Sequence, residues 1–160
     1  MYDHVLVGTD GSDTASRAVR AAAQLAQVHQ AKLTIAHAFH PRRRAEIVDR
    51  RAAAELHWML TPGAAAEVLV QRAVHDAQAA ACGGLDAAGR AEVGDPLTVL
   101  RSLIRELRPD VVVVGNADLR RPRLRRSLGH ALSCREHIDV IVVDTAGVDQ
   151  AGSRSDWSAA

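Results

Sequence analysis

Four short segments are continuously apolar, and we expect each to form a buried strand. They are rich in β-branched residues and do not alternate with polar positions, which is typical of parallel strands covered on both faces by helices. The four segments are residues 4–10, 31–39, 110–116 and 139–145. A shorter and more polar segment, GRAEVGD at 89–95, predicts a fifth strand at an edge of the sheet, where polar side chains are tolerated.

Between these strands, apolar residues recur at helical spacing. The segment at 12–30 has Ser12 or Asp13 as its N-cap, and the segment at 62–82 has a similar, weaker pattern. The clearest helix lies at 95–109, because Asp95 can cap it, Pro96 suits its first position and Pro109 ends it. The expected buried stripes are Ala15, Ala18, Val19, Ala22, Leu25 and Ala26 in the first helix, and Leu97, Leu100, Leu103, Ile104 and Leu107 in the last.

Strands that alternate with helices predict an α/β fold, a single-domain open doubly wound sheet of five parallel strands. We assign residues 1–146 to this domain and residues 147–160, which are small and polar, to a flexible C-terminal tail. The segment at 40–61 fits neither pattern well, and we expect it to be a partly helical excursion from the sheet.

Composition narrows the class of protein. A chain of 160 residues fits one domain, and an aromatic content of 2% means that the core is built from Ala, Val, Leu and Ile. The net charge of +1 and the lack of aromatic residues among the arginines argue against nucleic acid as a partner. No apolar run is long enough for a membrane span and no signal region precedes the first strand, so we expect a cytoplasmic protein.

A ligand of an open parallel sheet binds beyond the carboxyl ends of the strands, where the strand order reverses. Here GTDGS (8–12) follows the first strand and GNAD (115–118) follows the fourth. If these strands are neighbours, Gly8, Thr9, Asp10, Gly115 and Gly129 converge on one crevice. Gly129 would lie at a helix N-terminus, where unpaired N–H groups attract an anion.

The residues at this crevice do not suggest catalysis. Asp10 is interpreted either as a ligand-facing carboxylate or as a residue that holds the turn, and His37 as a core histidine. No Ser/His/Asp triad or set of metal ligands is evident, and Lys32 is the only lysine, which excludes a P-loop ATPase. We therefore expect no catalytic residue and no protein metal site, with at most slow incidental ATP hydrolysis.

Two separated segments resemble the universal stress protein family over about the first 145 residues. VLVGTDGSDTASRAVRAAAQLA is similar to the opening half of that family, and VVVVGN…SLGHALSCREHIDVIVVDT is similar to its closing half. The resemblance implies a flavodoxin-like sheet of the adenine-nucleotide α-hydrolase type. It also implies a homodimer through the last strand, at Val140, Ile141, Val142 and Val143, unless the tail covers that edge.

The ATP-binding branch of that family has a glycine, two residues, a glycine, nine residues, and then glycine with serine or threonine. Gly115 matches the first glycine, Asp118 replaces the second, Gly129 comes one residue late and His130 replaces the hydroxyl residue. The resemblance thus implies a degraded motif and these nucleotide-binding residues: Gly8, Thr9, Asp10, Ala38, Val114, Gly115, Gly129, His130, Ala131 and Leu132.

Asp118 and the five arginines between 120 and 126 act in opposite directions at such a site. A carboxylate repels phosphate, whereas guanidinium groups bind it, unless the arginines form a solvated loop without a ligand. The first hypothesis is a non-catalytic stress and signalling module that binds ATP or cyclic AMP, with or without Mg²⁺. The alternative is a nucleotide-free dimer that acts through protein partners and whose pocket is vestigial.

Overall fold

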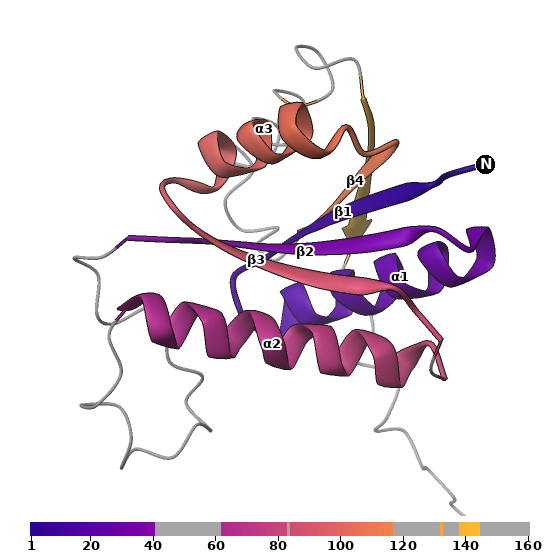
Figure 1. Ribbon diagram of the computed structural model, residues 1–160, viewed down its shortest axis with the longest axis horizontal. Coiled ribbons are helices and arrows are strands. Elements are labelled where there is room, and N and C mark those ends of the chain that lie inside the picture. Colours follow the sequence, from indigo (N-terminus) through magenta and orange to yellow (C-terminus); the bar gives the residue numbers. More distant parts are fainter. Residues whose placement is uncertain (41–61, 83, 117–131, 133–137, 145–160) are drawn as a thin grey trace, which may run out of the picture.

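The core of the molecule is a parallel sheet of five strands in the order β3-β2-β1-β4-β5 (Figure 1). The computed structural model describes residues 1–40, 62–82, 84–116, 132 and 138–144. The strands are β1 (His4–Thr9), β2 (Lys32–Phe39), β3 (Ala87–Val93), β4 (Val111–Asn116) and β5 (Asp139–Asp144). This arrangement confirms the predicted fold class, including the polar strand β3 at one edge.

In the described part of the chain, three helices lie against the two faces of this sheet. They are α1 (Asp13–His29), α2 (Pro62–Ala80) and α3 (Pro96–Leu107). Figure 1 shows α1 and α2 together on one face and α3 on the other. The chain therefore crosses from face to face between β2 and β4, as a doubly wound sheet requires.

The helix boundaries have local causes that the sequence predicts correctly. Ser12, not Asp13, is the N-cap of α1, and its hydroxyl accepts a hydrogen bond from the Ala15 amide at 3.1 Å. Asp95 caps α3 by accepting from the Thr98 amide at 3.1 Å. Hydrogen bonds from the Thr98 side chain, and next from its amide, lower the pKa of the Asp95 carboxyl. Pro96 occupies the first turn of α3, where its missing N–H costs nothing.

The sheet divides the core into two apolar layers. Alternate residues of each strand face opposite sides, so Val5 and Ile35 pack with α1 and α2, while Leu6 and Val112 pack with α3. Both layers consist of Ala, Val, Leu and Ile, as the low aromatic content predicts. In α3 the predicted stripe omits Val99, which is 4% exposed, while Leu97 and Leu107 are only partly buried.

At the amino ends of the strands, Asp110 fastens β4 to β1. Its carboxylate accepts hydrogen bonds from the amides of His4 and Asp3, at 2.8 and 2.7 Å. These two bonds hold the pKa of the Asp110 carboxyl below its usual value. In return the Asp110 amide donates to the His4 carbonyl, which fixes the register of the two central strands.

Several sequence predictions concern residues outside the described part of the chain. These are most of the excursion at 40–61, the arginine-bearing segment with Asp118, the tail, and the segment that contains Gly129, His130 and Ala131. Among the described residues, no helix has the length and the apolar character needed to cross a membrane.

Candidate functional site

The strand order reverses between β1 and β4, and a pocket lies at their carboxyl ends. From β1 the chain proceeds outward through β2 to β3, whereas β4 and β5 lie on the other side of β1. Val5, Leu6 and Val7 pair with Val111, Val112 and Val113, so the two strands end beside each other. This is the topological switch point at which doubly wound sheets bind their ligands.

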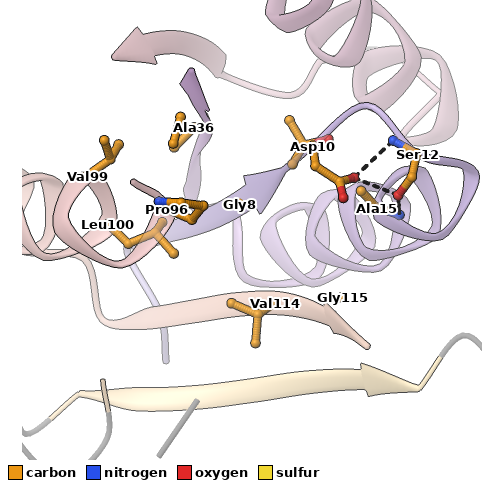
Figure 2. Close-up of a pocket in the computed structure, with 12 residues that line it drawn as sticks. Gly8, Asp10, Ser12, Ala15, Ala36, Pro96, Val99, Leu100, Val114 and Gly115 are labelled. Atoms are coloured by element: carbon orange, nitrogen blue, oxygen red, sulfur yellow. Dashed lines mark hydrogen bonds between the residues drawn. The ribbon is translucent and has the colours of Figure 1, made fainter. Parts of the chain in front are cut away.

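The pocket encloses about 190 Å³ between the carboxyl ends of β1, β2 and β4, the turn after β1 and the first turns of α1 and α3. A single water molecule needs about 10–15 Å³ by the same kind of measure, so the space admits a small organic ligand. Figure 2 shows Asp10 and Ser12 at one end and the side chains of α3 at the other. The lining residues are Gly8, Thr9, Asp10, Ser12, Ala15, Ala36, Ala38, Pro96, Val99, Leu100, Val114 and Gly115.

The turn after β1 forms the polar end of the pocket and is held by its own hydrogen bonds. The Gly11 amide donates to Thr9 Oγ1 at 3.2 Å. The amide and hydroxyl of Ser12 both donate to Asp10 Oδ1, at 3.0 and 2.6 Å (Figure 2). Asp10 is exposed, holds the turn through these bonds and is one of the residues that line the pocket; its role as a ligand-facing carboxylate stays a prediction.

Gly11 is required by the shape of this turn. Its φ of +78° lies in the left-handed region, which a side chain disfavours. A Cβ at this position would also lie 2.6 Å from Leu69 Cδ1, on the neighbouring helix α2. The turn therefore packs against Leu69 of α2. This contact helps to hold Thr9 and Asp10 at the pocket.

Gly115 permits a close approach of a different kind. An added Cβ would lie 3.2 Å from Ala18 Cβ and 3.5 Å from the Thr14 carbonyl oxygen, both on α1. The absence of a side chain thus lets the start of α1 rest on the end of β4. The first glycine of the family pattern has a packing role here in addition to its position on the pocket.

Charge is unevenly distributed around the pocket. Among the described lining residues, Asp10 is the only charged one, and Thr9 and Ser12 are the other polar side chains. The remaining surface is apolar and comes from Ala, Val, Leu, Pro and Gly. Within the described ranges no group of three or more His, Cys, Asp or Glu side chains is placed to hold a metal ion.

The structure brings six of the sequence-predicted site residues together in this pocket: Gly8, Thr9, Asp10, Ala38, Val114 and Gly115. Leu132 is not among the described lining residues; it is fully buried in the apolar layer under α3, which also contains Val99, Leu100 and Val114. Gly129, His130 and Ala131 fall outside the described residues, so the predicted phosphate-binding segment has no structural description.

Sequence reasoning missed the contribution of the helices. Pro96, Val99 and Leu100 of α3, together with Ser12 and Ala15 of α1, also line the pocket. A signal was available, because each helix that follows a strand in a parallel sheet begins at the carboxyl edge. The first turns of α1 and α3 therefore had to lie near the site.

Comparison with known proteins agrees with this architecture. The model of the universal stress protein family matches residues 1–144. Universal stress protein Rv1636 of Mycobacterium tuberculosis is 38% identical over 151 residues, which cover 90% of this chain and 97% of that protein.

Solved structures of the same family superpose on the chain. A universal stress protein in complex with cAMP has a TM-score of 0.68 and 35% identity, with 91% of this chain and 98% of that chain covered. A universal stress protein family protein from Arabidopsis thaliana with AMP bound has a TM-score of 0.63 at 15% identity, covering 89% and 91%, a likeness of fold alone. On the family match and the 38% identity, this chain belongs to the universal stress protein family.

Proposed function

We propose that this chain is a non-catalytic binding module that takes an adenine nucleotide in the pocket at the ends of β1 and β4. The observation that carries the proposal is one pocket with two unlike ends. Apolar residues of β2, β4 and α3 form one end, and the acidic turn after β1 forms the other.

Each part of a nucleoside has a suitable counterpart in this pocket. An adenine ring is flat and largely apolar on its faces, which suits the surface formed by Ala38, Val99 and Leu100. Ribose hydroxyls are donors, and the exposed Asp10 carboxylate is an acceptor at the adjacent end. The relative bound to cAMP, at 35% identity, supports the same ligand class for this chain.

The charge of the described pocket favours cyclic AMP over ATP. Asp10 repels phosphate, and no lysine or arginine is among the described lining residues. One like-charge contact costs about 1 kcal/mol in water at 4 Å, which corresponds to about fivefold in affinity. ATP carries more negative charge than the cyclic monophosphate, so it depends more on Mg²⁺ or on the arginines at 120–126.

Isothermal titration with cyclic AMP and with ATP, each with and without Mg²⁺, tests the proposal. In the absence of Mg²⁺, we expect cyclic AMP to bind at least fivefold more tightly than ATP. We expect added Mg²⁺ to strengthen the binding of ATP but not that of cyclic AMP. Absence of a heat signal from either nucleotide up to millimolar concentration would reject the proposed function.

A second candidate function, a dimer that acts through protein partners, draws on the position of β5 at an edge of the sheet. Ile141 and Val142 on this strand are 36% and 53% exposed, and an apolar edge strand favours pairing with another chain. The homodimer through this edge therefore forms part of our proposal in either case.

Val142→Lys should convert the dimer to a monomer, as measured by light scattering. A wild-type protein that is already monomeric would reject the proposed assembly. The cytoplasmic location and the role in stress signalling stay predictions.

A further inference from the structure

His37 lies under the rim of the pocket without lining it. It is 4% exposed and pairs with Thr9 at the last rung between β2 and β1. Its neighbours Ala36 and Ala38 line the pocket, so by the alternation of a strand the imidazole points to the opposite face of the sheet.

The imidazole is bonded to the residue at which β1 leaves the sheet. His37 Nδ1 lies 2.9 Å from the Thr9 carbonyl oxygen. A carbonyl oxygen only accepts, so Nδ1 is the donor and carries the hydrogen. The bond anchors the backbone of Thr9, whose hydroxyl in turn accepts from the Gly11 amide, and the next residue is the pocket carboxylate Asp10.

A purely packing role does not account for a histidine at this position. Leu33 and Ile35, on the same face of β2, fill the core with apolar side chains. His37 Nε2, by contrast, is buried and has no hydrogen-bond partner among the residues the structure describes. A buried polar atom without a partner is unfavourable, and an aliphatic side chain would avoid that cost.

We propose that His37 is a positioning residue for the nucleotide site, which fixes the Thr9–Asp10 backbone from the far face of the sheet through its Nδ1–H. This inference rests on the proposed function, because it assigns His37 to that site. His37 acts through the turn and touches no ligand.

The test compares two substitutions at His37 with a control at the other end of the sheet. His37→Leu removes the donor, whereas His37→Asn retains an N–H near the position of Nδ1. His4→Leu is the matched control, since His4 Nε2 is hydrogen-bonded to Thr34 Oγ1 at 2.8 Å, far from the pocket at the amino end of β1. Cyclic AMP affinity is measured for each folded variant by titration, and stability by chemical denaturation.

We expect His37→Leu to weaken cyclic AMP binding about fivefold to tenfold, the loss of roughly one hydrogen bond. His37→Asn should bind within about twofold of the wild type, and His4→Leu should lose stability without losing affinity. Unchanged affinity in His37→Leu would overturn the inference, as would an Asn variant that binds as weakly as the Leu variant.

Two further measurements separate this inference from the proposed function. If the wild type binds no nucleotide, the proposed function fails, and amide exchange at Gly11 and Ser12 decides the role of His37. If these amides exchange faster in His37→Leu than in the other variants, the proposed positioning role of His37 is supported. Equal exchange in all variants overturns it. If His37→Leu does not fold, long-range ¹H–¹⁵N spectra of the wild type at pH 8 must place the His37 proton on Nδ1; a proton on Nε2 overturns the inference.

Discussion

Two glycines on the pocket have different physical reasons to be glycine. A Cβ at Gly8 would meet only Leu100, at 3.6 Å, which is an ordinary contact inside the pocket. A Cβ at Gly115 would press on Ala18 at 3.2 Å, and Ala18 belongs to a buried helix face. A side chain at position 8 would reduce the space inside the pocket. A side chain at position 115 would prevent the close approach of α1 to the sheet.

Gly8→Ala should therefore reduce binding without harming the fold. We expect cyclic AMP affinity to fall at least fivefold, since the methyl group occupies pocket volume. The free energy of unfolding should stay equal or rise by up to about 1 kcal/mol, because glycine in a strand is intrinsically unfavourable. Gly115→Ala is the contrasting variant, with an expected loss of about 1–3 kcal/mol from overpacking. Full nucleotide affinity in Gly8→Ala would show that the ligand does not use this pocket.

His4 makes the stability of the fold sensitive to mild acid. Burial, and next the nearby Lys32 charge, lower the pKa of His4 below its usual 6.5, although Asp110 and Asp86 act in the opposite direction. In the unfolded chain His4 takes up a proton first, so its contribution to stability is present above about pH 6.5 and is lost as the pH falls toward the folded-state pKa. A further loss begins below about pH 3.8, where Asp110, whose pKa is also lowered, is protonated in the unfolded chain first.

Denaturation of the wild type and His4→Leu between pH 8 and pH 5 measures the first of these effects. At pH 8 the variant should be less stable by about 1 kcal/mol, because the hydrogen bond to Thr34 is lost. The difference should shrink toward pH 5, since only the wild type loses the contribution of His4. A difference that is constant or that grows at low pH would contradict the lowered pKa.

At the scale of elements, the packing of α2 on the edge strand β3 depends on Gly89. An added Cβ there would collide with Val70 Cγ1 and lie 3.3 Å from Val74 Cγ2, and both valines belong to the buried face of α2. Gly89→Ala should therefore lower the free energy of unfolding by about 1–3 kcal/mol. Thermal denaturation checks this value.

Gly63→Ala is the control for that substitution, because it also adds one methyl group, at a glycine in the first turn of α2. Its Cβ would lie 3.8 Å from Phe39, an ordinary contact, and alanine favours the helix. We expect this variant to be as stable as the wild type or more stable. Equal effects of the two substitutions would contradict the close approach at Gly89.

The same elements explain which parts of the fold the sequence predicts. Continuous apolar runs predicted four strands to within one or two residues at each end, because strands covered on both faces have no polar side. Strand β3 required a different argument, since its residues are only half-buried and Arg90 forms ion pairs with Glu92 and Glu106. Its polarity nevertheless indicated an edge, where the structure places it.

At the scale of the whole molecule, strand order was the part that local patterns could not supply. Hydrophobic periodicity does not say whether β4 lies beside β1 or beside β3, because that choice depends on long-range packing. The pairing of Val7 with Val113 settles it and creates the pocket. The site residues at the carboxyl ends of β1 and β4 were predicted because ligands of parallel sheets bind there. Val99 and Leu100 on α3 were missed because they look like ordinary core residues.

The central claim is that one adenine nucleotide occupies the space between the ends of β1 and β4. Titration of ¹⁵N-labelled protein with cyclic AMP, followed by amide chemical shifts, tests it most directly. We predict that the largest shifts occur at Gly8, Thr9, Asp10, Ala38 and Gly115, and that amides at the amino ends of the strands, such as those of His4 and Lys32, stay unchanged. Largest shifts outside this pocket, or none at millimolar nucleotide, would contradict the claim.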